Sequence, residues 1–115
     1  MISVINAKQD FPNSSYAVFL VEQEIELSEK LGVNALVVIH GYGSHGTGGV
    51  IKKELHLKLK ELVRKKVIVN FFKGEEWGEQ NLEIKELKKQ EPELILHPLL
   101  TNLNSGVTVI WIRKK

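Results

Sequence analysis

Residues 36–54 read LVVIHGYGSHGTGGVIKKE, and this stretch decides the fold. An apolar run ends at His40, five glycines occupy the nine positions 41–49, and a basic segment with helical spacing follows. Glycine loses more conformational entropy on folding than any other residue, so this density indicates left-handed backbone or a ligand close to the backbone amides. Unpaired N–H groups and the dipole of a following helix both favour an anion. The stretch therefore predicts a strand, a phosphate-binding loop and a helix.

Further elements are predicted on both sides of this unit. Apolar runs indicate strands over 2–6, 35–39, 67–72 and 107–112. Residues 12–15 are expected to form a turn whose serines can cap a first helix that runs to about 31, and helical spacing indicates further helices over 49–65 and 81–90. A brief edge strand is expected over 94–96, and Gly32 should end the first helix. The first helix is expected to bury Ala17, Leu20, Val21, Leu27 and Leu31, and the second Ile51, Leu55, Leu59, Leu62 and Val63.

The order of these elements predicts an α/β fold in a single domain over 1–115. Two strand–helix–strand units are followed by a returning strand, which gives a mixed four-stranded sheet with two main helices. Ligands of open α/β sheets bind at the carboxyl ends of the strands, where the loop at 40–49 must lie.

Charge is distributed unevenly along the chain, although the formal net charge is only +2. Residues 52–66 carry seven basic and two acidic side chains, whereas 1–51 and 73–93 are both net acidic. A basic helix after the glycine loop fits a nucleic-acid footprint or a solvated helix face. The chain has no cysteine and no apolar run of about 18 residues, so disulfides, thiolate zinc sites and membrane spans are not expected, and a cytoplasmic location is.

The stretch Gly41–Gly46 matches the spacing G-x-G-x-x-G of dinucleotide-binding folds. The third strand, however, is followed by Lys73 instead of an acidic residue for the ribose, and the chain is too short for two nucleotide-binding halves. A P-loop is also excluded, because Gly49 stands where its lysine is needed. No organic cofactor is expected.

Residues 38–52 resemble the central motif of Smr (small MutS-related) domains, in which an apolar strand leads into His-Gly-x-Gly, Thr-Gly and a helix. The additional residues 44–46 are similar to a branch of the family whose loop reads His-Gly-Tyr-Gly-Ser. The stretch 104–109, Asn-Ser-Gly-Val-Thr-Val, is similar to the entry into the last strand of these domains. Gly74 and Glu75 also fit that branch, and the resemblance extends over about residues 2–113.

This resemblance implies a two-layer α/β sandwich like the C-terminal domain of translation initiation factor three. It also implies binding of DNA or RNA and, in several members, a DNA-nicking or RNA-cleaving endonuclease assisted by Mg²⁺ or Mn²⁺ and linked to DNA repair or recombination. His40 would be the catalytic acid-base or phosphate-orienting group. The phosphate-binding residues would be His40, Gly41, Gly43, Gly46, Thr47, Gly48, Gly49, Lys52 and Lys53.

The first strand departs from the family pattern. Smr domains carry Leu-Asp-x-His-Gly there, whereas this chain has Val-Ile-Asn-Ala-Lys over 4–8, with Asn6 nearest to the aspartate. An amide cannot act as a base and binds divalent metal more weakly than a carboxylate. Three hypotheses therefore stand: a nuclease of altered competence, a catalytically silent nucleic-acid-binding module, and a binder of a small phosphate ligand.

Several residues outside the motif are assigned roles on weaker grounds. His45, His56 and His97 are expected to be surface or neutral histidines, and Trp111 to pack in the last strand. Trp77 is expected to plug the sheet edge, with stacking on a base as the alternative. Asp10, Glu75 and Glu76 are the candidate substitute carboxylates, and an apolar edge near 94–100 offers a surface for a second chain. The oligomeric state is not predicted.

Overall fold

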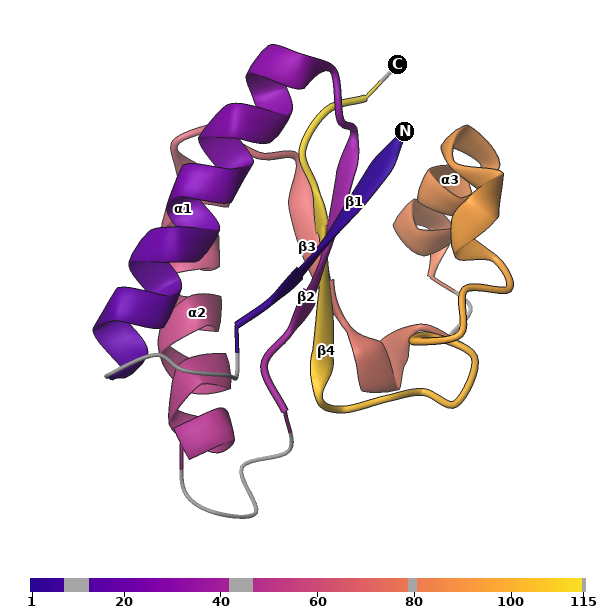
Figure 1. Ribbon diagram of the computed structural model, residues 1–115. Coiled ribbons are helices and arrows are strands. Elements are labelled where there is room, and N and C mark those ends of the chain that lie inside the picture. Colours follow the sequence, from indigo (N-terminus) through magenta and orange to yellow (C-terminus); the bar gives the residue numbers. More distant parts are fainter. Residues whose placement is uncertain (8–12, 42–46, 79–80, 115) are drawn as a thin grey trace.

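The computed structural model describes residues 1–7, 13–41, 47–78 and 81–114 (Figure 1). Four strands alternate with three α-helices and two short 3-10 helices. In chain order they are β1 (Ile2–Asn6), α1 (Ser14–Leu31), β2 (Ala35–Ile39), α2 (Thr47–Arg64), β3 (Asn70–Lys73), η1 (Gly74–Glu76), α3 (Leu82–Gln90), η2 (Pro92–Leu94) and β4 (Val107–Trp111).

The four strands form one mixed sheet in the order β1-β2-β4-β3. β1 and β2 are parallel, and α1 connects them, as a crossover connection requires. β4, the last strand of the chain, lies between β2 and β3 and runs antiparallel to both of them. The predicted α/β class and the mixed four-stranded sheet are confirmed.

α1 and α2 cover one face of the sheet and form with it the two predicted layers, and α3 with its flanking segments adds cover on the other face (Figure 1). Their shared core contains Val21, Leu36, Leu55, Leu59 and Ile110, among other residues. The side chain of Asn13 caps the start of α1 by accepting a hydrogen bond from the Tyr16 amide. Gly32 ends the helix with φ 74°, in the left-handed region, as predicted.

The segment from η1 to β4 covers the opposite face of the sheet (Figure 1). Its apolar side chains pack with β2 and β4 in a second core: Ala35, Val37, Phe72, Trp77, Ile84, Leu87, Leu94, Leu100, Val107, Val109 and Trp111. β2 is therefore buried on both faces, as its unbroken apolar run predicted. The helix predicted over 81–90 is confirmed, and Trp77 and Trp111 both pack in the core.

The edge strand predicted over 94–96 is wrong. Pro92 begins the short helix η2, and Leu94 then enters the second core while Leu96 remains 81 % exposed. Leu100 is also buried, so this segment offers no apolar sheet edge to a second chain. Proline supplies no backbone N–H and fixes φ near −65°, which suits the first turn of a helix better than a strand.

The predicted buried face of α1 is only partly correct. Ala17 and Val21 are buried as expected, but Leu27 and Leu31 are 47 % and 62 % exposed. The buried positions are instead completed by Val18, Ile25 and Ser28, and Leu20 is half-buried. α1 therefore carries apolar side chains on two faces, of which only one contacts the sheet and α2.

The third strand begins later than predicted. The spacing indicated a strand from 67, whereas β3 begins at Asn70. α2 ends at Arg64, and Lys66 then takes φ 62° so that the Val67 amide can donate to the Leu62 carbonyl. Residues 65–69 are used to reverse the chain after the helix, which leaves only four residues to pair with β4.

Candidate functional site

His40 directly follows β2 at the carboxyl end of the strand, as predicted from the sequence. Its side chain is fully buried. Its ring Nδ1 lies 3.1 Å from the Gly41 carbonyl oxygen, and its Nε2 lies 2.9 Å from the Thr108 hydroxyl on β4. Both ring nitrogens therefore make hydrogen bonds within the chain.

The Thr108 hydroxyl also contacts a second histidine. His56 of α2 is 8 % exposed, and its Nε2 lies 2.8 Å from the same oxygen. The two imidazole rings meet edge to face with centroids 6.1 Å apart. Thr108 thus links α2 to the end of β2 through one hydroxyl, which can donate one hydrogen bond and accept others.

The Gly41 carbonyl fixes which atoms donate hydrogen bonds in this network, because a carbonyl oxygen can only accept them. The Gly41 carbonyl accepts, so His40 Nδ1 carries the proton and Nε2 is the acceptor for the Thr108 hydroxyl. The threonine oxygen then accepts from His56 Nε2–H. All three side chains are satisfied when both histidines are neutral, in a directed chain from α2 to Gly41.

Electrostatics favour the same neutral state. Burial lowers the pKa of His40 below its ordinary value of 6.5, and the positive charge of Lys52 lowers it further. Burial also lowers the pKa of His56 to about 4, with the charges of the neighbouring His40, Lys52 and Lys73 acting in the same direction. Both rings are therefore uncharged at neutral pH.

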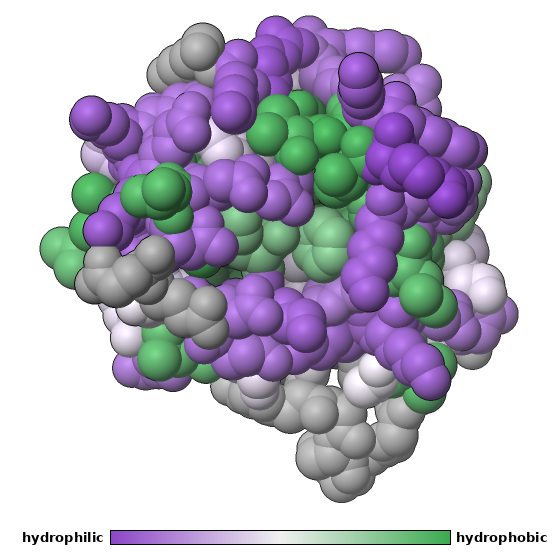
Figure 2. Space-filling model, turned by 180° about the vertical axis from the view of Figure 1, so that it is seen from behind, coloured by the Kyte–Doolittle hydropathy of each residue, from purple (hydrophilic) through white to green (hydrophobic). Residues whose placement is uncertain are grey.

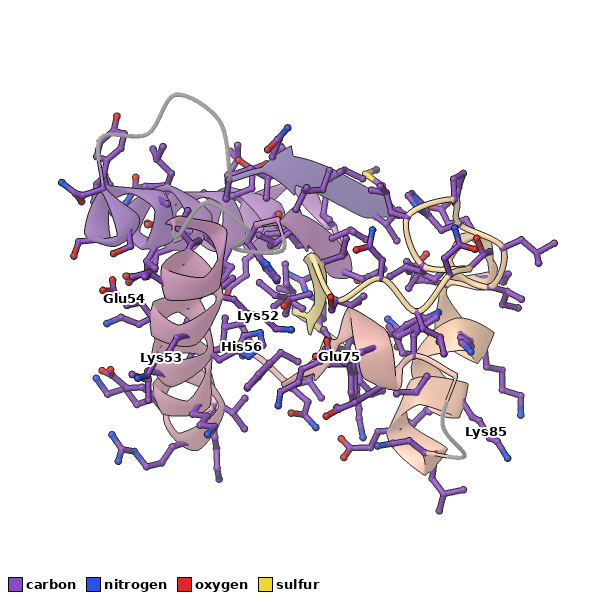
Figure 3. The ribbon with its side chains drawn as sticks, turned by 90° about the horizontal axis from the view of Figure 1, so that it is seen from below. Lys52, Lys53, Glu54, His56, Glu75 and Lys85 are labelled. Carbon is purple, nitrogen blue, oxygen red and sulfur yellow. The ribbon has the colours of Figure 1, made fainter. Side chains whose placement is uncertain are left out.

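Lys52 connects α2 to η1 and to the loop before β4. Its Nζ donates to both carboxylate oxygens of Glu75, at 3.0 and 2.8 Å, and to the Ser105 carbonyl at 3.0 Å. Partial burial alone would raise the pKa of Glu75, but the hydrogen bond and charge of Lys52 outweigh it and lower that pKa. Figure 3 shows Lys52, His56 and Glu75 on the same side of α2, whereas Lys53 points away from them.

Glycine is favoured at two positions where the backbone closes on this network. Gly41 has φ 80°, in the left-handed region that disfavours side chains. Its amide and that of His40 both donate to the Gly106 carbonyl, at 3.0 and 2.9 Å. A Cβ on Gly106 would lie 3.2 Å from the Gly41 carbonyl carbon, so a larger residue would push the residue before β4 and the residue after His40 apart.

The outer face of α2 carries a row of cations. Lys53, Lys60 and Arg64 are spaced at i, i+7 and i+11, which places them within about 40° of one another around the helix. All three are exposed, and within the described residues none of them makes an ion pair. We call these three residues the basic face. Lys60 also lines a groove against Phe71 and Lys73 of β3.

The crystal structure of the Smr domain of Thermus thermophilus MutS2 aligns with this chain at a TM-score of 0.61. The alignment covers 97 % of this chain and 99 % of that domain, with 19 % sequence identity. This chain has the fold of an Smr domain. No family model and no curated protein matches the sequence.

The Smr fold brings together some of the predicted site residues. His40, Gly41 and Lys52 lie around one network, and the backbones of Thr47, Gly48 and Gly49 form the first turn of α2. Lys53 lies on the basic face instead. Gly43, Gly46, His45 and the candidate carboxylate Asp10 lie outside the described residues.

Two residues of the network were not predicted from the sequence. His56 was expected at the surface but is buried, and Thr108 had no assigned role in a site. The signal was the spacing of four between Lys52 and His56, which places them on one side of the helix. That side contacts Ser105 before β4 and Thr108 within it. Glu75, a candidate metal ligand, is the partner of Lys52.

The divalent metal implied by the family resemblance was tested against the donor groups. Among the described ranges 1–7, 13–41, 47–78 and 81–114, no three His, Asp or Glu side chains converge on a common point. Mg²⁺ and Mn²⁺ prefer carboxylate and carbonyl oxygens, and Glu75 already neutralises Lys52. These described residues therefore do not form a magnesium or manganese site.

In the part of the chain that the structure describes, no helix combines the length and the apolar character needed to span the hydrocarbon core of a membrane.

Proposed function

We propose that this Smr-fold chain binds nucleic acid along the basic face of α2, with the glycine segment 41–49 at one end of the contact. The observation that carries the proposal is the row of unpaired cations Lys53, Lys60 and Arg64 on the helix that follows this segment. Regularly spaced cations without ion-pair partners in the described chain fit a phosphate backbone better than a solvated helix that serves only the fold.

The groove beside the basic face also fits binding of nucleic acid. Lys60, Phe71 and Lys73 line the groove between α2 and β3. Glu76 lines it as well and lies 4.0 Å from Lys73 Nζ, so Lys60 is the cation of this groove that makes no ion pair within the described residues. Figure 2 shows hydrophobic side chains in a hollow on the back of the molecule, with hydrophilic side chains around them. Cationic grooves with aromatic side chains bind single strands by contacts to the backbone and by stacking on bases.

The role of His40 is proposed as positioning. Its ring bonds to Gly41 and Thr108, so a direct contact with phosphate requires one of these bonds to break. We infer that His40 holds Gly41, the first residue of the glycine segment, at the end of β2. The first turn of α2, at Thr47–Gly49, can then present its backbone amides to a phosphate.

Binding is favoured over cleavage as the function. Hydrolysis of a phosphodiester needs an activated water and neutralisation of the developing charge. Asn6 stands at the end of β1, where Smr nucleases have an aspartate, and the described carboxylates do not gather into a metal site. The catalytically silent module is therefore the hypothesis that these residues support best.

The salt dependence of binding tests the proposal. Each cation–phosphate contact contributes about 0.9 to the slope of log affinity against log salt for duplex DNA. We expect Lys53→Gln/Lys60→Gln to lower this slope by about 2 and to weaken binding of DNA and RNA irrespective of sequence.

The matched control is Lys85→Gln/Lys89→Gln, which removes the same charge from exposed positions on α3. Lys85 lies far from the Lys52 network in Figure 3. The control should keep the slope of the unmodified chain. Equal losses in both double variants would reduce the effect to net charge and would remove the assignment to α2. A small phosphate ligand, the third hypothesis, would be favoured if affinity for nucleic acid did not change with salt.

A further inference from the structure

Lys52 is a cation of α2 whose charge and hydrogen-bond donors are used within the chain. Its Nζ lies 3.0 and 2.8 Å from the two carboxylate oxygens of Glu75 and 3.0 Å from the Ser105 carbonyl oxygen. An ammonium group carries three N–H donors, so these contacts use all of them. Lys52 therefore has no donor left for a phosphate while the Glu75 carboxylate remains in place.

This ion pair lies in line with the groove between α2 and β3. Lys60 and Phe71 line the groove, and Phe71 also contacts the ring of His56, one turn earlier on α2. One turn nearer still to the start of α2, Lys52 pairs with Glu75 (Figure 3). The contacts of three successive turns of α2 thus follow one line from the groove to the ion pair. A strand of nucleic acid that follows the groove is directed toward Lys52.

The Glu75 carboxylate and a phosphodiester offer the same chemistry to an ammonium group. Each presents two oxygens that share one negative charge, and both accept charge-assisted hydrogen bonds. A phosphate can therefore replace the carboxylate on Lys52 Nζ while the bond to the Ser105 carbonyl is retained. The side chain of Glu75 is 41 % exposed, so water can hydrate the carboxylate once it is released.

We propose that Glu75 masks Lys52 in the free chain and that a phosphate of single-stranded nucleic acid displaces it, so that Lys52 becomes a ligand of the bound strand. This inference rests on the proposed binding of nucleic acid along α2 and names the residue that limits it. Glu75 competes with the strand for one cation, and it therefore lowers affinity for every sequence alike.

The first test measures binding of labelled oligothymidylate to the full chain by fluorescence anisotropy over a range of salt concentrations. Glu75→Gln keeps the shape of the side chain but removes its charge. We expect affinity to rise about fivefold at low salt, and the slope of log affinity against log salt to steepen by about 0.7. Urea unfolding of each variant verifies that it is folded.

Glu86→Gln is the matched control for the loss of one negative charge and one ion pair. Glu86 lies on α3, and its carboxylate is 3.6 Å from Lys114 Nζ. This variant should keep the affinity and the slope of the unmodified chain. An equal rise in Glu75→Gln and Glu86→Gln would reduce the effect to net charge and would overturn the proposal.

Lys52→Gln separates masking of a cation from a general repulsion of phosphate by Glu75. Without Lys52 there is no cation to mask, so the further change Glu75→Gln should alter affinity no more than Glu86→Gln does. A fivefold rise that persists in the Lys52→Gln background would overturn the proposal.

The variant Lys53→Gln/Lys60→Gln, measured in parallel, distinguishes this inference from the proposed function. If it weakens binding while Glu75→Gln has no effect, the basic face binds nucleic acid and the mask is rejected. If only Glu75→Gln changes affinity, Lys52 is masked as proposed and the basic face is rejected. If the unmodified chain and every variant fail to bind oligothymidylate, both proposals are rejected.

Discussion

α1 and α2 are two helices of 18 residues that lie side by side on the same face of the sheet. Their inner faces are alike, because Val21 and Ile25 of one helix and Leu55 and Leu59 of the other meet in one core. Their outer faces differ in kind. α1 exposes acidic side chains together with Tyr16, Phe19, Leu27 and Leu31, whereas α2 exposes the basic face.

The difference distinguishes the side chains that stabilise the fold from those that are available to bind a partner. The sheet requires only the inner side chains of each helix, since these exclude water from the core. The outer side chains are free of that requirement, and so their composition is informative about partners. We assign the outer face of α2 to nucleic acid, whereas the glutamates on α1 do not fit the same partner.

The largest contrast is expected between the two apolar faces of α1. Ile25→Ala should lower the free energy of unfolding by about 3 kcal/mol, because the side chain is 2 % exposed and leaves a cavity. Leu27→Ala should lower it by less than about 1 kcal/mol, because that side chain is already 47 % exposed. Urea unfolding at low protein concentration measures both. An equal loss of stability in the two variants would mean that α1 buries Leu27, as its sequence pattern predicted.

The inner face of α2 differs from that of α1 because His56 makes a buried hydrogen bond there with Thr108 of β4. Thr108→Val should lower the free energy of unfolding by about 2 kcal/mol, because it keeps the shape but removes the shared partner of His40 and His56. Thr101→Val is the control at an exposed threonine and should change stability little. Chemical denaturation compares the two, and a neutral Thr108→Val would show that the hydroxyl does not hold the network together.

The same connection makes stability depend on pH. The folded-state pKa of His56 is about 4 and its ordinary value is 6.5, so the unfolded chain binds the proton first as the pH falls. The stabilisation is complete above pH 6.5 and should be lost progressively between pH 6.5 and 4, with His40 acting in the same direction. Charges facing the ring include Lys52, Lys73 and Glu75.

His56→Gln provides the comparison for this pH profile. Glutamine does not titrate and retains an N–H donor, so thermal unfolding of the variant should vary less with pH over the same interval. Identical pH profiles for the variant and the unmodified chain would contradict burial of a neutral His56.

The smallest effect is expected in a cleavage assay. Supercoiled plasmid and single-stranded RNA, each incubated with the chain and Mg²⁺ or Mn²⁺, should remain intact, because the described residues offer no site for the metal. The His40→Ala variant is the matched control. Cleavage by the unmodified chain that this variant abolishes would replace the silent module with a nuclease in which His40 is required.

The sequence was sufficient for the elements that have one distinctive pattern. The unbroken apolar run of β2 and the glycine at the end of α1 identified a central strand and a helix end. Leu55 and Leu59 identified the buried face of α2, because cations occupy its other side. The glycine segment correctly predicted a strand end followed by a helix.

The sequence was not sufficient where two patterns satisfy the same periodicity. On α1, the sets containing Leu27 and Ile25 both have helical spacing, and only contact with α2 and the sheet selects Ile25. His56 could not be placed for a related reason. Its burial depends on Thr108, which is 52 residues away in the chain and becomes a neighbour only when β4 inserts between β2 and β3.

The central claim is that nucleic acid binds the outer face of α2 and not that of α1. Amide chemical shifts, recorded while short single-stranded RNA or duplex DNA is added, test it most directly. The account predicts changes along α2 around Lys53, Lys60 and Arg64, and no changes along the exposed side chains of α1. Changes confined to α1 or α3, or none at saturating nucleic acid, would contradict it.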